Sequence, residues 1–244
     1  MKTLIIIPSR LSATRLPGKP LLKINGLSMI SHVFKKAEEA NIGDVVVATE
    51  DQEIMDDVKK NGGQAILTKK EHKTGTDRIY EALQKLDHKN IELIMNLQGD
   101  EPLMNIQDIR HLNDLMIRNK SLIGTLASKI KDKSLYENEN IVKVSTKDYL
   151  DNLNFPEAIN FARKISKEDE NIYHHLGIYS YKKETLKDFV SYNQSSNEIK
   201  NRLEQLRALD NKIRINVALA KSSPIGVDTE EDFLAIKKIM EYKS

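Results

Sequence analysis

Short apolar segments alternate with helix-like segments through the first half of the chain, and this alternation restricts the fold more than any other feature. Continuous apolar runs occur at 4–7, 45–48, 65–67, 92–97 and 122–127. They are separated by segments in which apolar residues have helical spacing, at roughly 28–41, 51–61, 76–86 and 105–119. Strands that are apolar on both faces are typical of a parallel sheet covered by helices on both sides. The pattern therefore predicts an α/β protein.

The pattern changes after about residue 135. Strands are expected near 141–146, 158–163, 173–181 and 213–219, with a charged helix near 196–209 and a final helix at 229–242. The length of 244 residues suits one large domain, and no Pro/Gly/Ser-rich linker divides it. We therefore expect a single Rossmann-like domain over 1–244, in which a mostly parallel sheet carries an added β-rich portion at roughly 135–212. That portion is a candidate for pairing subunits.

The composition excludes several broad classes of function. Lys and Arg number 38 against 36 Asp and Glu, so no general polybasic character directs the chain to nucleic acid or to a membrane surface. The absence of cysteine excludes disulfides and thiolate metal sites. No apolar run is long enough for a signal peptide or a membrane span. We therefore expect a cytoplasmic protein that binds neither nucleic acid nor membranes.

Positive charge is concentrated at the start of the chain, where seven Lys or Arg residues precede the first acidic residue, Glu38. The apolar run at 4–7 leads directly into the basic segment, PSRLSATRLPGKP at 8–20. In open α/β sheets, ligands bind beyond the carboxyl ends of the strands. Backbone amides of a tight loop, together with cations, form a cradle for phosphates. The residues expected in this cradle are Pro8, Ser9, Arg10, Arg15 and Lys19.

The basic segment differs from two common nucleotide-binding loops. Pro20 follows Lys19 where a Walker loop has the Ser or Thr that holds magnesium. No GxGxxG sequence follows a predicted strand, which disfavours a dinucleotide site. A solvated basic surface loop is the alternative interpretation at this point.

Two carboxylates occupy positions that suit a metal bound to a nucleotide phosphate. Asp100 follows the strand at 92–97 within QGDEP, and Asp228 precedes the final helix within GVDT. A carboxylate at the tip of a buried strand, across from a cationic loop, suits Mg²⁺ that is also coordinated by phosphate oxygens. Each residue could instead cap a helix or close an acidic turn. Together with the basic loop, the two carboxylates favour a metal–phosphate site.

Two further segments each leave two interpretations open. Thr74 and Gly75 lie between a predicted strand and a helix, where they suit either a close approach to a base or ribose, or a helix cap. His175 and Tyr179 lie four residues apart on one face of a predicted strand. They are candidates for substrate donors or for part of a packed aromatic row.

The segment LEQLR at 203–207 falls within the helix predicted at 196–209. A spacing of three directs its two leucines toward the core. Taken alone, Glu204, Gln205 and Arg207 would form a solvated helical face.

Six segments spread over nearly the whole chain match the motifs of one enzyme family. They are IIIPSRLSATRLPGKPL at 5–21, KTGTDR at 73–78, NLQGDEP at 96–102, HLGIY at 175–179, LEQLR at 203–207 and GVDT at 226–229. On these motifs the chain resembles the 3-deoxy-manno-octulosonate (Kdo) cytidylyltransferases, also called CMP-Kdo synthetases. The first and third motifs indicate cytidylyltransferases for acidic sugars, and the last three narrow the resemblance to the Kdo branch.

The resemblance implies a Rossmann-like nucleotide-diphospho-sugar transferase fold and the transfer of CMP from CTP to Kdo, with release of pyrophosphate. It also implies Mg²⁺ as cofactor, a cytoplasmic homodimer and a product used in lipopolysaccharide assembly. By position, Arg10, Lys19 and Asp100 would act in catalysis, and Asp100 and Asp228 would bind magnesium. The residues implied to hold CTP are Pro8, Ser9, Arg10, Arg15, Lys19, Thr74 and Gly75. The residues implied to surround the acidic sugar are Arg78, Gln98, His175, Tyr179, Glu204 and Gln205.

Four departures from the family pattern lie in the segments assigned to the sugar. His174 replaces the usual Arg or Lys before HLG, Ala162 replaces a serine, Ser180 a glycine and Asn201 a glutamate. They leave open which eight-carbon acid is used, for example an amino-substituted Kdo. Two rival functions also remain: a cytidylyltransferase for sialic- or pseudaminic-type sugars, and a non-catalytic module that binds CTP.

Overall fold

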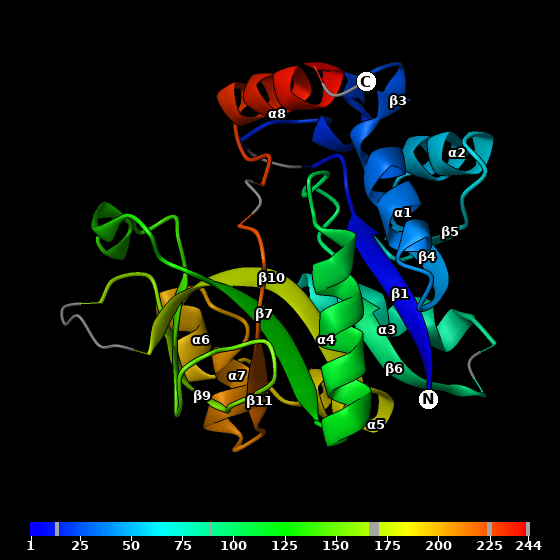
Figure 1. The fold of residues 1–244 in the computed structure, drawn as a ribbon. Helices are drawn as coiled ribbons and strands as arrows, with labels where there is room; N and C mark the ends of the chain where they lie inside the picture. The colour runs from blue at the N-terminus through cyan, green and yellow to red at the C-terminus, as the bar shows by residue number, and fades with distance from the viewer. Residues whose placement is uncertain (13–14, 88, 166–170, 224–225, 243–244) are drawn as a thin grey trace. The chain divides into compact units, whose positions relative to one another are not determined.

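The structure is a computed structural model that describes residues 1–12, 15–87, 89–165, 171–223 and 226–242 (Figure 1). The chain divides into two compact units. We call them the N-terminal unit (residues 2–91, 95–106 and 224–244) and the central unit (residues 1, 92–94 and 107–223). The strand β6 (Ile91–Asn96) is shared between them. No helix within the described ranges is long and apolar enough to cross a membrane.

Parallel strands form the sheet of the N-terminal unit. β1 (Lys2–Ser9) pairs in parallel with β4 (Gly43–Thr49), and β4 pairs in parallel with β5 (Ala65–Leu67). The register places Ile5 opposite Val45, and both side chains are buried. The predicted apolar runs are therefore neighbouring parallel strands, as their composition indicates.

Amphipathic helices follow the strands of this unit. Its helices are η1 (Lys19–Leu21, a 3₁₀ helix), α1 (Met29–Glu39), α2 (Gln52–Lys60), α3 (Gly75–Lys85) and α8 (Glu230–Tyr242). The helix α3 begins at a capping box, because Thr74 Oγ1 accepts a hydrogen bond from the Asp77 amide and Asp77 Oδ2 accepts one from the Thr74 amide. The capping interpretation of Thr74 is thus confirmed.

A short hairpin, which the sequence pattern did not predict, follows the basic segment. It consists of β2 (Lys23–Ile24) and β3 (Leu27–Ser28), and it turns at Asn25 and Gly26, whose φ angles are 48° and 77°. Such left-handed angles at both central residues are those of the tight turns that join antiparallel strands.

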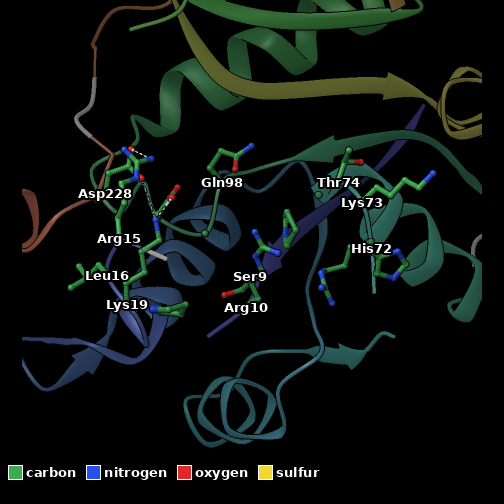
Figure 2. A pocket seen from close by; sticks show the side chains of 16 residues that line it. Ser9, Arg10, Arg15, Leu16, Lys19, His72, Lys73, Thr74, Gln98 and Asp228 are labelled. Carbon is green, nitrogen blue, oxygen red and sulfur yellow. Dashed lines mark hydrogen bonds and ion pairs between the residues drawn. The ribbon is translucent and has the colours of Figure 1, made fainter. Parts of the chain in front are cut away.

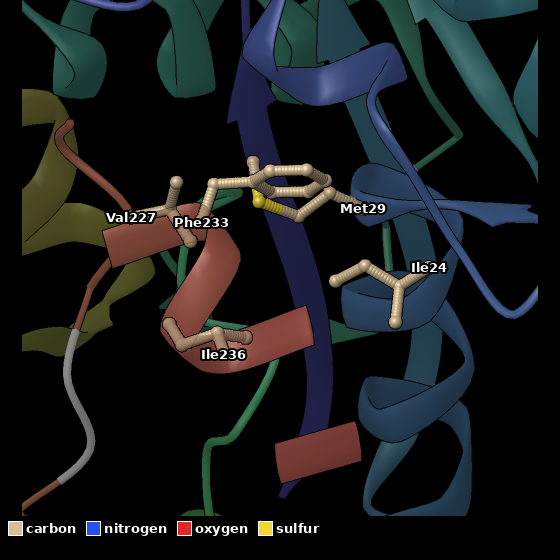
Figure 3. Close-up of a cluster of buried hydrophobic side chains, with 5 residues drawn as sticks. All are labelled: Ile24, Met29, Val227, Phe233 and Ile236. Carbon is tan, nitrogen blue, oxygen red and sulfur yellow. The ribbon is translucent and has the colours of Figure 1, made fainter. Parts of the chain in front are cut away.

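An apolar cluster joins this hairpin to α8 (Figure 3). Ile24, Met29, Val227, Phe233 and Ile236 are buried together. Leu16 of the basic segment and Leu22, which follows that segment, pack against them. Burial of such side chains removes apolar surface from water and is the main force that holds the helix in place. The cluster contains Val227, so it also fixes the residue beside Asp228.

The central unit carries the β-rich addition that the sequence predicted. β7 (Ile123–Lys129) pairs in parallel with β11 (Ile215–Leu219) and antiparallel with β10 (Ile172–Lys182). β10 also pairs with β8 (Lys143–Thr146), which pairs with β9 (Ala158–Ala162), and both of these contacts are antiparallel.

The helices of the central unit differ from the predicted ones. They are η2 (Lys133–Tyr136, a 3₁₀ helix), α4 (Ile106–Asn119, almost all of which lies in this unit), α5 (Lys183–Ser191), α6 (Ser196–Asn201) and α7 (Leu206–Asp210). The single helix predicted at 196–209 is wrong. Arg202, with φ 52°, ends α6 in the left-handed conformation, and a turn separates α6 from α7.

Candidate active site

Residues at the carboxyl end of β1 and in the loop after β6 line a cavity of about 380 Å³ (Figure 2). All of its lining residues belong to the N-terminal unit. They are Pro8, Ser9, Arg10, Arg15, Leu16, Lys19, Pro20, His72, Lys73, Thr74, Gly75, Arg78, Gln98, Gly99, Asp100 and Asp228. The cavity thus brings together every residue that was predicted to hold the nucleotide, both predicted metal ligands, and two of the predicted sugar ligands.

Lys19 lies between the two predicted metal ligands. Its Nζ donates hydrogen bonds to Asp100 Oδ2 at 2.6 Å and to the Val227 carbonyl at 2.7 Å, and it lies 3.6 Å from Asp228 Oδ1. Arg15 Nη2 lies 3.0 Å from Asp228 Oδ2. Only 14% of the Lys19 side chain is exposed, so the alternative of a solvated basic loop is wrong for this residue. Two cations of the basic segment are neutralised by two carboxylates that are distant in sequence.

The helix-cap alternative for Asp228 is also wrong, because its neighbour performs that function. The Asp232 amide donates to Thr229 Oγ1 at 3.2 Å, and the Thr229 amide donates to Asp232 Oδ2 at 2.9 Å. These contacts provide hydrogen-bond partners for the backbone amides at the start of α8. The Asp228 carboxylate pairs instead with Arg15 and Lys19.

A third carboxyl group, Glu101, lies beside this ionic cluster and was not singled out by the sequence. The pKa of Glu101 is raised to about 8, mainly by burial and to a smaller extent by the negative charges of Asp100 and Asp228. Its Oε2 atom is buried and has no hydrogen-bond partner within the described residues. Because Glu101 is buried next to Asp100, negative charge is crowded at this position, and an added positive charge would be strongly stabilised there.

The donor set fits a magnesium ion that is held partly by phosphate. The Lys19 ammonium already demonstrates that Asp100 and Asp228 can face one cation. No group of three or more His, Cys, Asp or Glu side chains in the described ranges forms a complete metal site. Mg²⁺ is typically bound by one or two carboxylates and completes its coordination with substrate phosphates and water. Asp100 and Asp228 therefore suit Mg²⁺ that arrives with a nucleotide.

The wall of the cavity opposite the basic segment is held by buried polar contacts. Arg78 is 4% exposed; it donates hydrogen bonds to Glu50 and Thr68 and to the Lys69 carbonyl. The guanidinium therefore fixes the segment before Thr74 as well as lining the cavity. Its contact with a sugar stays a prediction, as does that of Gln98.

Glu81 anchors the same wall from the next turn of α3. It accepts hydrogen bonds from His72, Lys85 and the Lys69 amide. Burial by itself would raise the pKa of Glu81, but the hydrogen bonds from Lys85, the Lys69 amide and His72 outweigh it and lower the pKa to about 2. Sequence analysis missed both Glu50 and Glu81, because acidic residues on α/β surfaces are common. Only the fold pairs these two with Arg78 and His72 of the cavity wall.

The other predicted sugar ligands lie in the central unit and are packed. Phe161, His175, Tyr179, Tyr181 and Phe189 form a row in which consecutive ring centroids lie between 5.1 and 6.0 Å apart. The alternative of a packed aromatic row is thus confirmed for His175 and Tyr179, and a role in binding sugar stays a prediction. Burial, and secondarily the charges of Tyr181 and Glu204, raise the pKa of Tyr179, so the phenol keeps its proton.

His175 is expected to make the protein sensitive to mild acid. Burial, with a smaller contribution from His174, lowers its pKa to about 3, whereas an unfolded histidine titrates near 6.5. Between these values the unfolded state binds a proton that the folded state does not, so stability falls as the pH falls. The free energy of unfolding should drop by about 2–3 kcal/mol from this group between pH 7 and pH 4.5.

Denaturant titrations of the wild type and His175→Gln at the two pH values would measure this drop. The variant should lose less stability on acidification than the wild type. An equal drop in both proteins would contradict the assignment.

Glu204 and Gln205 lie in the turn between α6 and α7 and not on a helix face, and Gln205 is buried. Arg207 is 2% exposed, so the expected solvated face is wrong at this position too. The charge on Arg207 is matched by Glu198, nine residues earlier, to which it donates hydrogen bonds from Nε and Nη2.

Comparison with known proteins places these features in a family. Residues 4–215 match the cytidylyltransferase family. A 3-deoxy-manno-octulosonate cytidylyltransferase of Afipia carboxidovorans is 42% identical over 98% of this chain and 96% of its own length, and one of Rhodopseudomonas palustris (strain BisB18) is 42% identical over 99% and 98%. The solved structure of a CMP:2-keto-3-deoxy-manno-octonic acid synthetase complexed with CTP is similar over 100% of both chains, with a TM-score of 0.90 and 32% identity.

Proposed function

The chain belongs to the family of 3-deoxy-manno-octulosonate cytidylyltransferases, and on this premise we propose that its basic cavity is where CMP is transferred from CTP to Kdo. The observation that carries the proposal is the position of Lys19 between Asp100 and Asp228. A loop that binds a triphosphate needs cations, and a loop that also binds magnesium needs carboxylates within the same reach. A module that only sensed CTP would not need both carboxylates.

In the proposed reaction the anomeric 2-hydroxyl of the sugar attacks the α-phosphorus of CTP. The hydroxyl gives up its proton to solvent as an oxygen–phosphorus bond forms, the bond from the α-phosphorus to the bridging oxygen breaks, and pyrophosphate leaves. Phosphoryl-type transfer requires mainly positioning and neutralisation of charge. Arg10 and Lys19 are proposed to neutralise the leaving pyrophosphate, and the amides near Ser9 to orient the phosphates. Mg²⁺ held by Asp100 and Asp228 would supply further positive charge and make a hydroxyl that it contacts more acidic.

The family resemblance supports six residues as proposed sugar ligands. They are Arg78 and Gln98 in the N-terminal unit, and His175, Tyr179, Glu204 and Gln205 in the central unit. An acidic sugar needs a cation or several neutral donors for its carboxylate and hydroxyls. With their ionisation suppressed by burial, His175 and Tyr179 would contribute neutral donors.

A panel of acidic sugars would test the function directly. Purified protein with CTP and Mg²⁺ is expected to release pyrophosphate with Kdo. An amino-substituted Kdo tests whether the departures from the family pattern change the sugar that is used; these are at Ala162, His174, Ser180 and Asn201. A sialic acid tests the rival function. Binding of CTP without pyrophosphate release from any sugar would contradict the proposal and favour the non-catalytic module.

We also propose that the protein acts as a cytoplasmic homodimer and that its product is used in lipopolysaccharide assembly. The family resemblance supports both statements. Three large side chains of the central unit add support for a dimer, because Tyr149, Leu153 and Ile159 are 64%, 81% and 59% exposed. Light scattering of the wild type and of Leu153→Asp would test it; a monomeric wild type would contradict the proposal.

The ion pairs in the cavity lead to a prediction about metal-free nucleotide. Without Mg²⁺, Lys19 and Arg15 remain paired with Asp100 and Asp228, so CTP must compete with these carboxylates. Asp228→Asn should therefore bind CTP about fivefold more tightly than the wild type in the presence of EDTA, the effect of an ion pair worth about 1 kcal/mol. The same variant should lose most of its turnover when Mg²⁺ is present.

Calorimetric titration with CTP, with and without EDTA, would measure both affinities. Glu231→Gln is a suitable comparison, because it removes an exposed carboxylate from the first turn of α8. Weaker binding of metal-free CTP to Asp228→Asn than to the wild type would contradict the expected competition.

A further inference from the structure

The turn that carries Glu204 and Gln205 is held by an ion pair that crosses it. Glu198 lies in α6, before the turn, and Arg207 lies in α7, after it. Arg207 Nε donates to Glu198 Oε2 at 2.8 Å, and Nη2 donates to Oε1 at 2.6 Å. Both side chains are almost completely buried, at 2% and 4% exposure. This is the two-point geometry that restricts orientation as well as distance.

The backbone of the turn is tied to the same two residues. The Leu203 amide donates to the Glu198 carbonyl at 3.2 Å, and the Arg207 amide donates to the Glu204 carbonyl at 3.1 Å. The Glu198 carboxylate also accepts a hydrogen bond from the Ser195 amide and completes the capping box that begins α6. One carboxylate therefore connects the start of α6 to the end of the turn.

Arg207 further connects the turn to the aromatic row. Its guanidinium carbon lies 4.7 Å from the centroid of the Phe189 ring. Phe189 packs against Tyr181, which stacks on Tyr179, which in turn contacts His175. The four candidate sugar ligands of the central unit thus belong to one continuous packed assembly, and Glu198 and Arg207 are its charged part.

Stability alone is a weak reason for a buried ion pair. Desolvation of two charges offsets most of their attraction, and well-packed apolar residues of similar volume are often at least as stable. What an apolar pair does not provide is a fixed orientation. We propose that Glu198 and Arg207 are positioning residues for the acidic sugar, holding Glu204 and Gln205 in the geometry that binds it. The inference rests on the proposed function, in which this turn contacts the sugar.

The test separates orientation from stability with a neutral double variant. Arg207→Met alone leaves a buried, unpaired carboxylate and is expected to be much less stable. Glu198→Gln/Arg207→Met removes both charges and keeps the side chain that can complete the capping box, so it should regain most of the lost melting temperature. Its KM for Kdo should nevertheless stay about tenfold higher than that of the wild type, because the turn is no longer oriented. Its Kd for CTP with Mg²⁺ should remain unchanged.

Two further variants complete the design. Arg207→Lys keeps the charge without the two-point contact, so it should fold and should raise the KM for Kdo by about threefold, less than the double variant. Asn197→Ala is the matched control, because Asn197 Nδ2 donates to Asp210 Oδ1 at 2.9 Å and joins the same two helices on their exposed side. This control should leave the KM for Kdo unchanged.

A wild-type KM for Kdo in the folded double variant would overturn the proposal and leave the pair a stabilising element only. A wild-type KM in Arg207→Lys would overturn it as well, even if the double variant failed to fold. Gln205→Ala, measured beside them, tests the premise. If Gln205→Ala leaves the KM for Kdo unchanged, the proposed contact between this turn and the sugar fails. If Gln205→Ala raises the KM for Kdo and the double variant keeps the wild-type KM, only the positioning role is refuted.

Discussion

Asp100→Asn is expected to lower kcat by about a hundredfold or more at saturating Mg²⁺, the effect of removing one preorganised charged contact from a transition state. Asp100 is one of two carboxylates that suit the metal, and it is also the hydrogen-bond acceptor of Lys19 at 2.6 Å. The substitution keeps the size of the side chain and removes only its charge. The fold should survive, because the backbone contact from the Val227 amide to the Asp100 carbonyl remains.

Steady-state assays over a range of Mg²⁺ concentrations, together with a melting curve, would measure the effect. Asp44→Asn provides a matched control, because this exposed carboxylate on β4 pairs with Lys2 and lies outside the cavity. Turnover close to that of the wild type in Asp100→Asn would remove this residue from the active site.

Lys19→Ala is expected to reduce the rate of the chemical step by about 10²–10³-fold, and to weaken CTP binding much less. Charge on the departing pyrophosphate grows toward the transition state, so a cation beside it stabilises the transition state more than the ground state. Gly18, with φ 72°, brings the chain sharply into the 3₁₀ helix at Lys19. Arg10 and Arg15 remain in the variant to hold the ground-state triphosphate.

Single-turnover rates and a CTP titration would separate the two effects. Lys23→Ala removes an exposed lysine from the neighbouring hairpin and should change neither quantity. If CTP binding to Lys19→Ala collapses while the rate at saturating CTP stays near wild type, Lys19 is a ground-state anchor and its proposed role fails.

The sequence predicted the strands of the sheet and the position of the cavity for a common physical reason. Apolar runs such as 4–7 and 45–48 are buried on both faces, so their pattern depends on little except the fold class. Residues that follow parallel strands meet at one edge of the sheet, which brings Ser9 and Asp100 to the same cavity.

The failures of prediction arise where local signals compete or were overlooked. The hairpin β2–β3 was missed although Asn25-Gly26 is a strong turn signal, because strands of two residues carry no readable alternation. The helix at 196–209 was predicted from periodicity, and the left-handed conformation of Arg202 interrupts it. Arg207 was expected to be solvated because arginine usually is, and only the fold supplies Glu198 as its partner.

Partners across long sequence separations were also beyond the local pattern. The carbonyl of Val227, which accepts a hydrogen bond from Lys19, carries no side-chain signature. The same is true of the pairing of Arg78 with Glu50, which are 28 residues apart. These contacts determine the electrostatics of the cavity, and they become visible only in three dimensions.

The apolar cluster around α8 has a consequence for folding during synthesis. Its buried members are Ile24, Met29, Val227, Phe233 and Ile236. A ribosome delivers the basic segment and Asp100 long before it delivers Asp228, and the side chains that hold Val227 in place, Phe233 and Ile236, come later still. A nascent chain can therefore build its parallel strands and yet carry only one of the two carboxylates. Because both carboxylates are proposed to hold Mg²⁺, we expect catalytic competence only after α8 docks, and not gradually as the strands form.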